Sequence, residues 1–287
     1  MPFYVYAWIA SFSYGLVAII GKLTGKYAIP NAWLFNFLWM FFSLLITIPI
    51  ALLNGVGIPK VWGSLLLVAF FNTAFGILYI VSLTLLDISV LIPLMNFRTA
   101  FVAILGGLFL GEILSPIQYF FVLIIFIAGL FVSLDEKFSF RSFIRLPIAL
   151  ALLCTLSYTL MGMFIKKSIA ENGYWEVTLW MAIISQIMLI PSFFLFKKDI
   201  RKLNIKQLFS VFAMSLALAI GVIMENRAYK ENVIITNIVT ALPISMVLAF
   251  LLSIFAPKLL EKHTLKVYLI RFTAAAVMIA AALKISM

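Results

Sequence analysis

The sequence lacks most of the residues from which enzymes and metal centres are built. It has one cysteine, Cys154, and one histidine, His263. A single cysteine forms no intrachain disulfide, and the sequence has no zinc or iron–sulfur ligand spacing. It also has no G-x-x-x-x-G-K-[ST] motif, the phosphate-binding loop of many ATP-driven pumps. We therefore expect no metal, no cofactor and no catalytic residue, and an integral-membrane enzyme is an unfavoured alternative.

Charge is also scarce. Charged residues make up 11% of the chain and hydrophobic residues 65%. A soluble domain is about 25% charged and about 45–50% apolar. A soluble fold of 287 residues has no interior large enough for this much apolar surface. The net charge of +11 is spread between apolar runs and does not gather on one polar face, which argues against nucleic-acid binding.

Long apolar runs are what the sequence has in abundance. A helix of about 20 residues crosses roughly 30 Å of hydrocarbon, and these runs are too long for the strands of a membrane barrel. The first run has no basic start and no cleavage site, so it is predicted as a retained span. We predict an all-α integral membrane protein with ten transmembrane helices, over residues 3–24, 31–53, 61–84, 87–110, 114–134, 147–168, 175–196, 207–229, 233–256 and 265–285.

The second half of the sequence repeats features of the first in one register. Five helices per repeat is an odd number, so the two repeats are predicted to lie inverted in the membrane. We place them at residues 1–137 and 138–287. Inverted repeats are typical of secondary transporters, although a channel can also be built from them. The matched features are Ser13-Tyr14 with Ser157-Tyr158, Lys22 with Lys166, Trp33 with Trp175, Trp39-Met40 with Trp180-Met181, Pro49 with Pro191, Pro93 with Pro243, and Glu112 with Glu261.

One motif gives a family resemblance. Leu108-Phe109-Leu110-Gly111-Glu112 closes the fourth predicted helix, and Gly129 follows in the fifth. This resembles the L-x-L-G-E signature of the EamA domain in the drug/metabolite transporter superfamily, in its type with ten helices and two repeats. The second half keeps only Leu259-Leu260-Glu261, with Pro257 nearby and no glycine. The resemblance implies a transporter of small metabolites whose third, fourth, eighth and ninth helices line a central cavity.

Two of the charged residues inside the predicted spans are candidates for the site. Arg98 falls roughly 16 Å into the fourth helix, and Glu225 lies about four residues before the end of the eighth. Charges inside hydrocarbon are costly, so each needs a partner or a function. Arg98 is predicted either as a ligand for an anionic group or as one side of a structural ion pair, with Glu225 as its partner. Glu225 is also the candidate for proton coupling, because intramembrane carboxylates form proton relays.

Other polar residues and two prolines complete the predicted site. Pro93 and Pro243 interrupt the fourth and ninth helices at matched points and are hinge candidates. Each polar residue alone is as well explained by helix–helix hydrogen bonding. As a set on the expected cavity helices they are candidate substrate ligands: Asn72, Tyr79, Asn96, Asn226, Asn237 and Thr240.

The predicted function is secondary-active transport, most simply export, of small organic metabolites such as amino-acid-like or carboxylated solutes. The alternative is a channel or a non-transporting membrane assembly subunit. Expected partners are the lipid bilayer, a small-molecule substrate, and protons or a counter-substrate, in a monomer or homodimer in the plasma or inner membrane. Lys and Arg concentrate in the loops after odd-numbered spans, which favours termini outside. The family picture places both termini in the cytoplasm, so orientation stays open.

Overall fold

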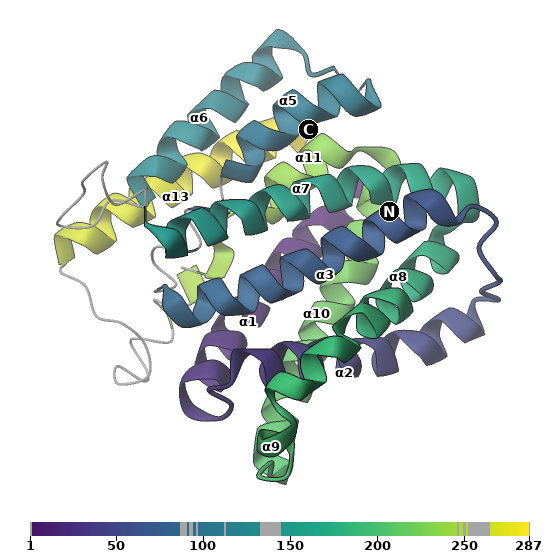
Figure 1. Ribbon diagram of the computed structural model, residues 1–287. Helices are drawn as coiled ribbons and strands as arrows, with labels where there is room; N and C mark the ends of the chain where they lie inside the picture. The colour runs from purple at the N-terminus through teal and green to yellow at the C-terminus, as the bar shows by residue number, and fades with distance from the viewer. Residues whose placement is uncertain are drawn as a thin grey trace.

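The structure is a computed structural model of the chain (Figure 1). It describes residues 2–86, 91, 94–95, 97–111, 113–132, 145–245, 247–248, 251 and 265–286. The regular secondary structure of these residues is entirely helical. The helices are α1 (Phe3–Tyr27), α2 (Ala32–Leu53), α3 (Trp62–Leu85), α5 (Phe97–Leu110), α6 (Pro116–Val132), α7 (Leu146–Asn172), α8 (Tyr174–Leu189), η2 (Ile190–Leu195), α9 (Lys197–Ile200), α10 (Ile205–Glu231), α11 (Val233–Thr240) and α13 (Leu265–Ser286).

The predicted membrane character is confirmed at the level of a multi-pass helical protein. Six segments of the described chain are long and apolar enough to cross a membrane. Three shorter apolar helices, within α5, α6 and α13, accompany them. The six long segments are Phe3–Tyr27, Ala32–Leu53, Trp62–Leu85, Leu146–Asn172, Tyr174–Leu195 and Ile205–Glu231.

Polar side chains start several of these helices. Asn31 accepts hydrogen bonds from the backbone N–H groups of Trp33 and Leu34 at the start of α2. Asn204 and Gln207 form a reciprocal capping box at the start of α10, and Asn232 caps α11. Such caps satisfy N–H groups that have no partner within the helix, typically for about 1 kcal/mol. Asparagine at the ends of apolar runs therefore fixes where the helices begin.

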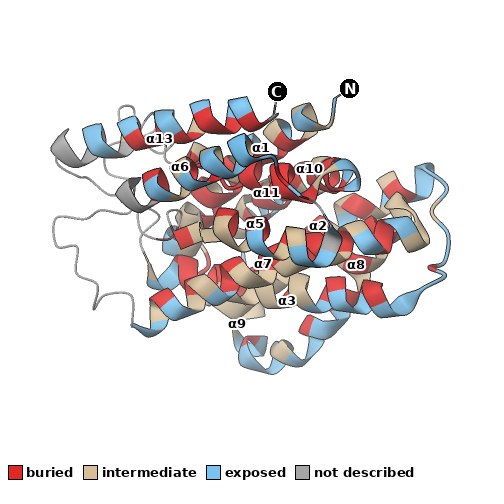
Figure 2. Ribbon diagram, turned by 90° about the horizontal axis from the view of Figure 1, so that it is seen from above, coloured by how far each residue is buried: buried red, intermediate tan, exposed pale blue. Residues whose placement is uncertain are grey.

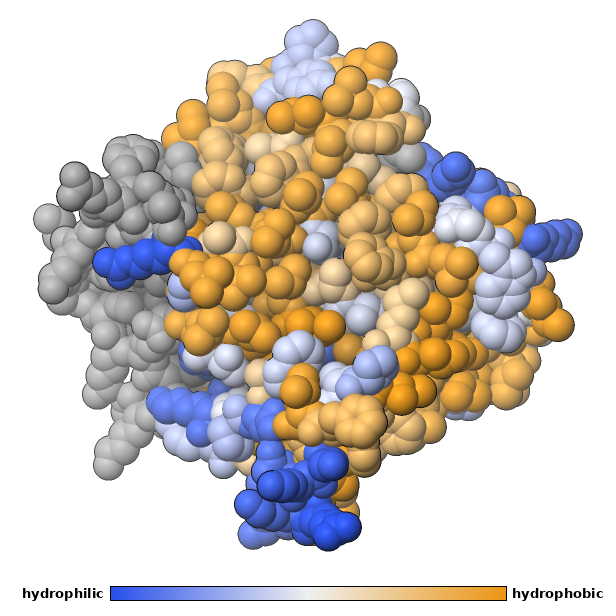
Figure 3. Space-filling view, in the orientation of Figure 1, coloured by the Kyte–Doolittle hydropathy of each residue, from blue (hydrophilic) through white to orange (hydrophobic). Residues whose placement is uncertain are grey.

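The helices pack into one bundle in which distant parts of the sequence are neighbours. The most extensive packing joins α1 to α10 and α3 to α7, followed by α6 to α13 (Figure 1). Buried residues lie on the faces that the helices turn toward one another, whereas α9 is largely exposed (Figure 2). Apolar residues cover much of the surface, and hydrophilic residues gather around α9 (Figure 3). This is the pattern of a bundle whose sides face lipid.

One end of the bundle is held by the loop between α2 and α3. Asn172, at the end of α7, accepts from the N–H groups of Lys60 and Val61 at 2.8 and 2.7 Å and donates to the carbonyl of Val61 at 2.9 Å. Glu176 accepts from the N–H of Gly57 at 3.0 Å. The turn between α7 and α8 thus binds the backbone of a loop from the first half of the chain.

The connection between α1 and α2 makes a second, smaller contact with the second half. Asn31 donates to Asp199 on α9 at 2.7 Å, and Gln207 on α10 donates to the carbonyl of Ala28 at 2.6 Å. Both polar contacts join the first half of the chain to the second. The two connections that follow α1 and α2 are therefore each bonded to the other half.

Candidate functional site

A cavity of about 120 Å³ lies inside the bundle. It is lined by α1, α2, α3, α7, α8 and α10, with Arg98 of α5 and the chain around Pro243. A water molecule needs about 10–15 Å³ measured this way, so the cavity holds several waters or a small polar group. Polar and aromatic residues among its lining are Ser11, Tyr14, Trp39, Ser43, Thr47, Asn72, Phe75, Tyr79, Arg98, Tyr158, Thr178, Glu225, Asn226, Thr240 and Ser245.

The end of α11 projects into this cavity because Pro243 stops the helix. Proline has no N–H to donate, and its ring clashes with the carbonyl four residues earlier, which here is that of Val239. The helix ends at Thr240, a turn follows, and helical structure resumes at Ile244. Ser11 of α1 donates to the Val239 carbonyl at 2.9 Å. The Val239 carbonyl, which loses its regular helical donor at Pro243, thus accepts from a side chain of another helix as well as from the N–H of Leu242 at 3.3 Å.

Arg98 is buried at the same helix end, with 4% of its surface exposed. Its Nη2 donates to the carbonyl of Asn237 at 2.9 Å and to the hydroxyl of Thr240 at 2.6 Å. Its guanidinium carbon lies 4.4 Å from the ring centre of Tyr158, a cation–π distance. Its Nε has no hydrogen-bond partner among the described residues. The guanidinium therefore faces the negative end of the α11 dipole and keeps one donor unused.

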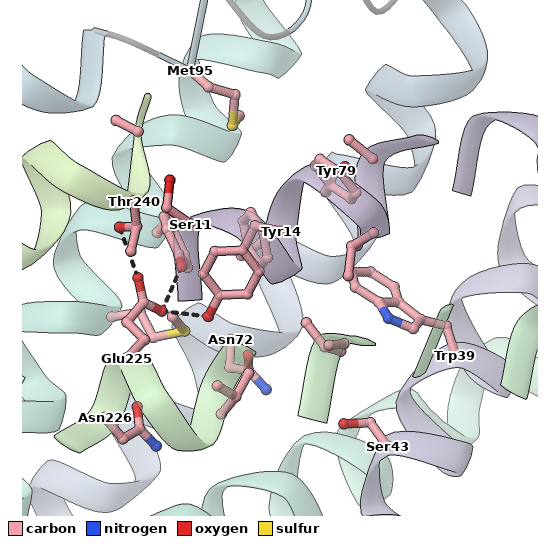
Figure 4. Close-up of a pocket in the computed structure, with 18 of the residues that line it drawn as sticks. Ser11, Tyr14, Trp39, Ser43, Asn72, Tyr79, Met95, Glu225, Asn226 and Thr240 are labelled. Atoms are coloured by element: carbon pink, nitrogen blue, oxygen red, sulfur yellow. Dashed lines mark hydrogen bonds between the residues drawn. The ribbon is translucent and has the colours of Figure 1, made fainter. Parts of the chain in front are cut away.

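Glu225 on α10 is buried, with 1% of its surface exposed. Its Oε2 accepts from the hydroxyls of Tyr14 and Tyr158, at 2.7 and 2.5 Å. The Thr240 hydroxyl lies 3.0 Å from Oε1 in a donating geometry (Figure 4). Two tyrosine hydroxyls thus solvate a carboxylate that burial removes from water, and the Thr240 hydroxyl is within reach as a third donor. Such hydrogen bonding is the condition under which a buried charge is tolerated.

The predicted partnership of Arg98 and Glu225 takes an indirect form. Sequence reasoning suggested a direct ion pair, whereas in the described chain the Thr240 hydroxyl stands between the two groups. That hydroxyl accepts from Arg98 and has one proton to donate, either to Glu225 or to the carbonyl of Thr236 at 2.9 Å. The physical reason is the broken helix, whose end carbonyl and threonine take both donors of Arg98 Nη2.

The structure brings most of the other predicted residues to the same cavity. Asn72 lines it and donates to Ser185 at 2.9 Å, and Tyr79 lines it beside the ring of Trp39. Asn226 lines it, donates to Thr178 at 3.2 Å, and has no partner for its Oδ1 among the described residues. Asn237 is buried behind the lining and contributes its backbone carbonyl to Arg98. Asn96 and Pro93 lie outside the described residues.

Sequence reasoning missed the two tyrosines that hold Glu225. Tyr14 and Tyr158 were recognised only as matched residues of the repeat, not as members of a site. Their hydroxyls converge on one oxygen although their helices, α1 and α7, lie far apart in the sequence. Figure 4 shows the Tyr14 hydroxyl directed at Glu225 and Trp39 beyond Tyr14 on the other side. The signal in the sequence was a tyrosine at equivalent positions of the two repeats, Tyr14 and Tyr158.

We expect Ser11→Ala to lower stability by about 1 kcal/mol, because it removes the shorter of the two hydrogen bonds to the Val239 carbonyl, which Pro243 deprives of its regular helical donor. The loss should appear as a lower melting temperature of the purified protein. Ser192→Ala is the matched control, since Ser192 donates only to the carbonyl of Leu189 three residues earlier, within one turn. Equal melting temperatures for the two variants would contradict this role of Ser11.

The described part of the site lacks the side-chain cluster that holds a transition metal. The described residues contain no group of three His, Cys, Asp or Glu side chains that could hold an ion. Cys154 is buried and free, with its sulfur 3.7 Å from the carbonyl of Phe75. What the cavity provides is a positive group, a negative group, hydroxyls and aromatic rings, which are the elements of non-covalent solute recognition.

Comparisons with known proteins agree with this picture. Residues 1–134 match the EamA-like transporter family, and this match confirms the predicted resemblance to the EamA family. A solved crystal structure, titled only as that of a protein, shares the fold with a TM-score of 0.71 and 12% sequence identity, and the alignment covers 98% of this chain and 94% of that one. A search of curated proteins gave no significant match. The matched family is one of membrane transporters, and the long apolar helices of this chain are those of a multi-pass membrane protein.

Proposed function

We propose that this chain is a secondary transporter that carries a small organic solute across the cell membrane by alternating access. The observation that carries the proposal is the buried Arg98–Thr240–Glu225 group on a cavity lined by both halves of the chain. Intramembrane charges mark substrate or ion pathways, and binding sites of secondary transporters lie between repeats near the middle of the membrane. The match of residues 1–134 to a transporter family supports the same conclusion.

We further propose the ten-helix architecture of two inverted repeats, 1–137 and 138–287. If the first to fifth spans correspond to the sixth to tenth, then α1 corresponds to α7 and α3 corresponds to α10. The two most extensive helix contacts, α1 with α10 and α3 with α7, are then equivalent under a two-fold axis. The contacts of α2 with α10 and of α3 with α8 form a second equivalent pair. Such matched packing supports a pseudo-two-fold axis in the membrane plane.

The proposed substrates are solutes with a carboxylate, amino-acid-like ones among them, moved outward. The Nε of Arg98, which has no partner among the described residues, would donate a hydrogen bond to the anionic group of the solute. Asn226 and Trp39 each keep one buried polar atom without a partner among the described residues. Both residues line the cavity, and these two atoms would form hydrogen bonds with the other polar groups of the solute. Asn72, Tyr79, Asn96, Asn237 and Thr240 complete the proposed binding set, with Pro93 and Pro243 as the hinges.

Transport is tested in proteoliposomes that hold purified protein. Radiolabelled amino-acid and carboxylate pools are offered outside vesicles preloaded with an excess of the same compounds. We expect saturable uptake with transient accumulation by counterflow, because a single site that alternates between sides exchanges its solutes. Conductance that rises linearly with voltage and shows no counterflow would instead establish the channel alternative and overturn this proposal.

Proton coupling is proposed for Glu225, whose oxygens lie within hydrogen-bond distance of three hydroxyls inside the bundle. We expect an imposed pH gradient to drive accumulation in vesicles with the unaltered protein. Glu225→Gln keeps the shape of the side chain but binds no exchangeable proton at this position, so gradient-driven accumulation should vanish while counterflow persists. Accumulation by Glu225→Gln equal to that of the unaltered protein would remove Glu225 from the coupling.

A further inference from the structure

The end of α11 has the features of a cation site. A helix C-terminus carries roughly half a negative charge and unpaired carbonyl groups. In transporters with interrupted helices, such carbonyl ends coordinate coupling cations such as Na⁺. Here the carbonyl of Asn237, the hydroxyl of Thr240 and the Oε1 of Glu225 converge near the end of α11. The Asn237 carbonyl also accepts from the N–H of Ala241 at 3.0 Å, so a cation would use its second lone pair. All three residues are at least nine-tenths buried.

A positive group already lies against two of these three oxygens, those of Asn237 and Thr240, and it is part of the protein. The Nη2 of Arg98 lies 2.9 Å from the Asn237 carbonyl and 2.6 Å from the Thr240 hydroxyl. Arginine stays charged under all physiological conditions, so the charge is permanent. The Tyr158 ring packs on the guanidinium at 4.4 Å and fixes it from the side.

We propose that the Arg98 guanidinium is a tethered substitute for a coupling cation. Substrate binding by this chain then requires neither Na⁺ nor K⁺, and removal of Arg98 opens a monovalent-cation site made of Asn237 O, Thr240 Oγ1 and Glu225 Oε1. The consequence for coupling rests on the transport function proposed above. The cation site itself does not, because it is tested without any substrate.

The first experiment measures the melting temperature of purified Arg98→Ala in choline chloride, sodium chloride, potassium chloride and guanidinium chloride at equal ionic strength. Guanidinium is used at about 20 mM, where its denaturing action is negligible. A cation present at ten times its dissociation constant should raise the melting temperature by about 3–6 °C over choline. We expect that rise for guanidinium, Na⁺ or K⁺ in Arg98→Ala, and no rise in the unaltered protein.

Two controls separate a site from general salt effects. Arg227→Ala removes an arginine of α10 that lies over the rings of Tyr6 and Tyr174 and does not line the cavity, and it should show no Na⁺- or K⁺-dependent rise. Arg98→Ala combined with Thr240→Val loses the hydroxyl ligand, so its response to cations should fall to that of the unaltered protein. If Arg98→Ala responds to no cation more than the unaltered protein does, the proposal is wrong.

A second measurement covers the case in which Arg98→Ala does not fold without a cation. The variant is then prepared throughout in about 20 mM guanidinium and transferred to choline, and its loss of fold on transfer supports the site. Failure to fold even in guanidinium contradicts it. Independently, ligand-induced stabilisation of the unaltered protein is compared in choline and in sodium buffers. A requirement for Na⁺ there would overturn the substitute role of Arg98 and leave the proposed transport function intact.

Discussion

Glu225→Ala should abolish transport and lower the free energy of unfolding by about 3–5 kcal/mol, the range for one side of a buried charge pair. The change leaves the Arg98 guanidinium buried without a nearby negative group. It also removes the acceptor of the Tyr14 and Tyr158 hydroxyls. Denaturant or thermal unfolding in detergent, together with counterflow in vesicles, measures both effects.

The control for this prediction removes the second charge as well. Arg98→Met in the Glu225→Ala background leaves no unpaired charge, so most of the lost stability should return while transport stays absent. A swap of the charges, Arg98→Glu with Glu225→Arg, should not restore stability. A simple ion pair tolerates such a swap, but here a carboxylate at position 98 would face the Asn237 carbonyl. Full recovery by the swap would show that the broken helix end does not define the polarity of the site.

Gly221→Ala should have the next largest effect, because it acts on Tyr14 through a close helix contact. A Cβ at Gly221 would come 2.6 Å from the Cε1 of Tyr14, so the ring must move. The Tyr14 hydroxyl then leaves Glu225, which lies one turn along α10. We expect a stability loss of about 1–3 kcal/mol, typical of overpacking, and a fall in transport of about tenfold or more.

The matched control is Gly63→Ala, since a Cβ at Gly63 on α3 meets nothing within 4 Å. That substitution should leave transport unchanged and stabilise the helix by up to about 1 kcal/mol. Combining Gly221→Ala with Tyr14→Ala removes the clash, so stability should partly recover without transport. Normal transport by Gly221→Ala alone would mean that the Tyr14 hydroxyl is not needed at Glu225.

The sequence was sufficient to predict a multi-pass helical membrane protein and to single out two charged residues that the structure buries on one cavity. The length of an apolar run predicts a membrane-spanning helix. A charged residue within such a run, such as Arg98 or Glu225, is conspicuous because charges there are rare. The hydrogen-bond partners were out of reach, because they depend on which faces of distant helices meet. Tyr14 and Glu225 are 211 positions apart, and only the packing of α1 on α10 joins them. The bridge through Thr240 depends on where Pro243 ends α11, a detail of local backbone that periodicity does not resolve.

The loop contact between the two halves has a consequence during synthesis. Asn172 is made 112 positions after Lys60, whose N–H it accepts. At about 5–20 residues per second, the ribosome supplies this partner roughly 6–22 s after the loop itself has emerged. Over that interval α3 also waits for α7, the helix with which it packs extensively. The nascent first half therefore lacks its partners in α7 and in the α7–α8 turn for several seconds, a period in which its apolar faces stay uncovered by the second half.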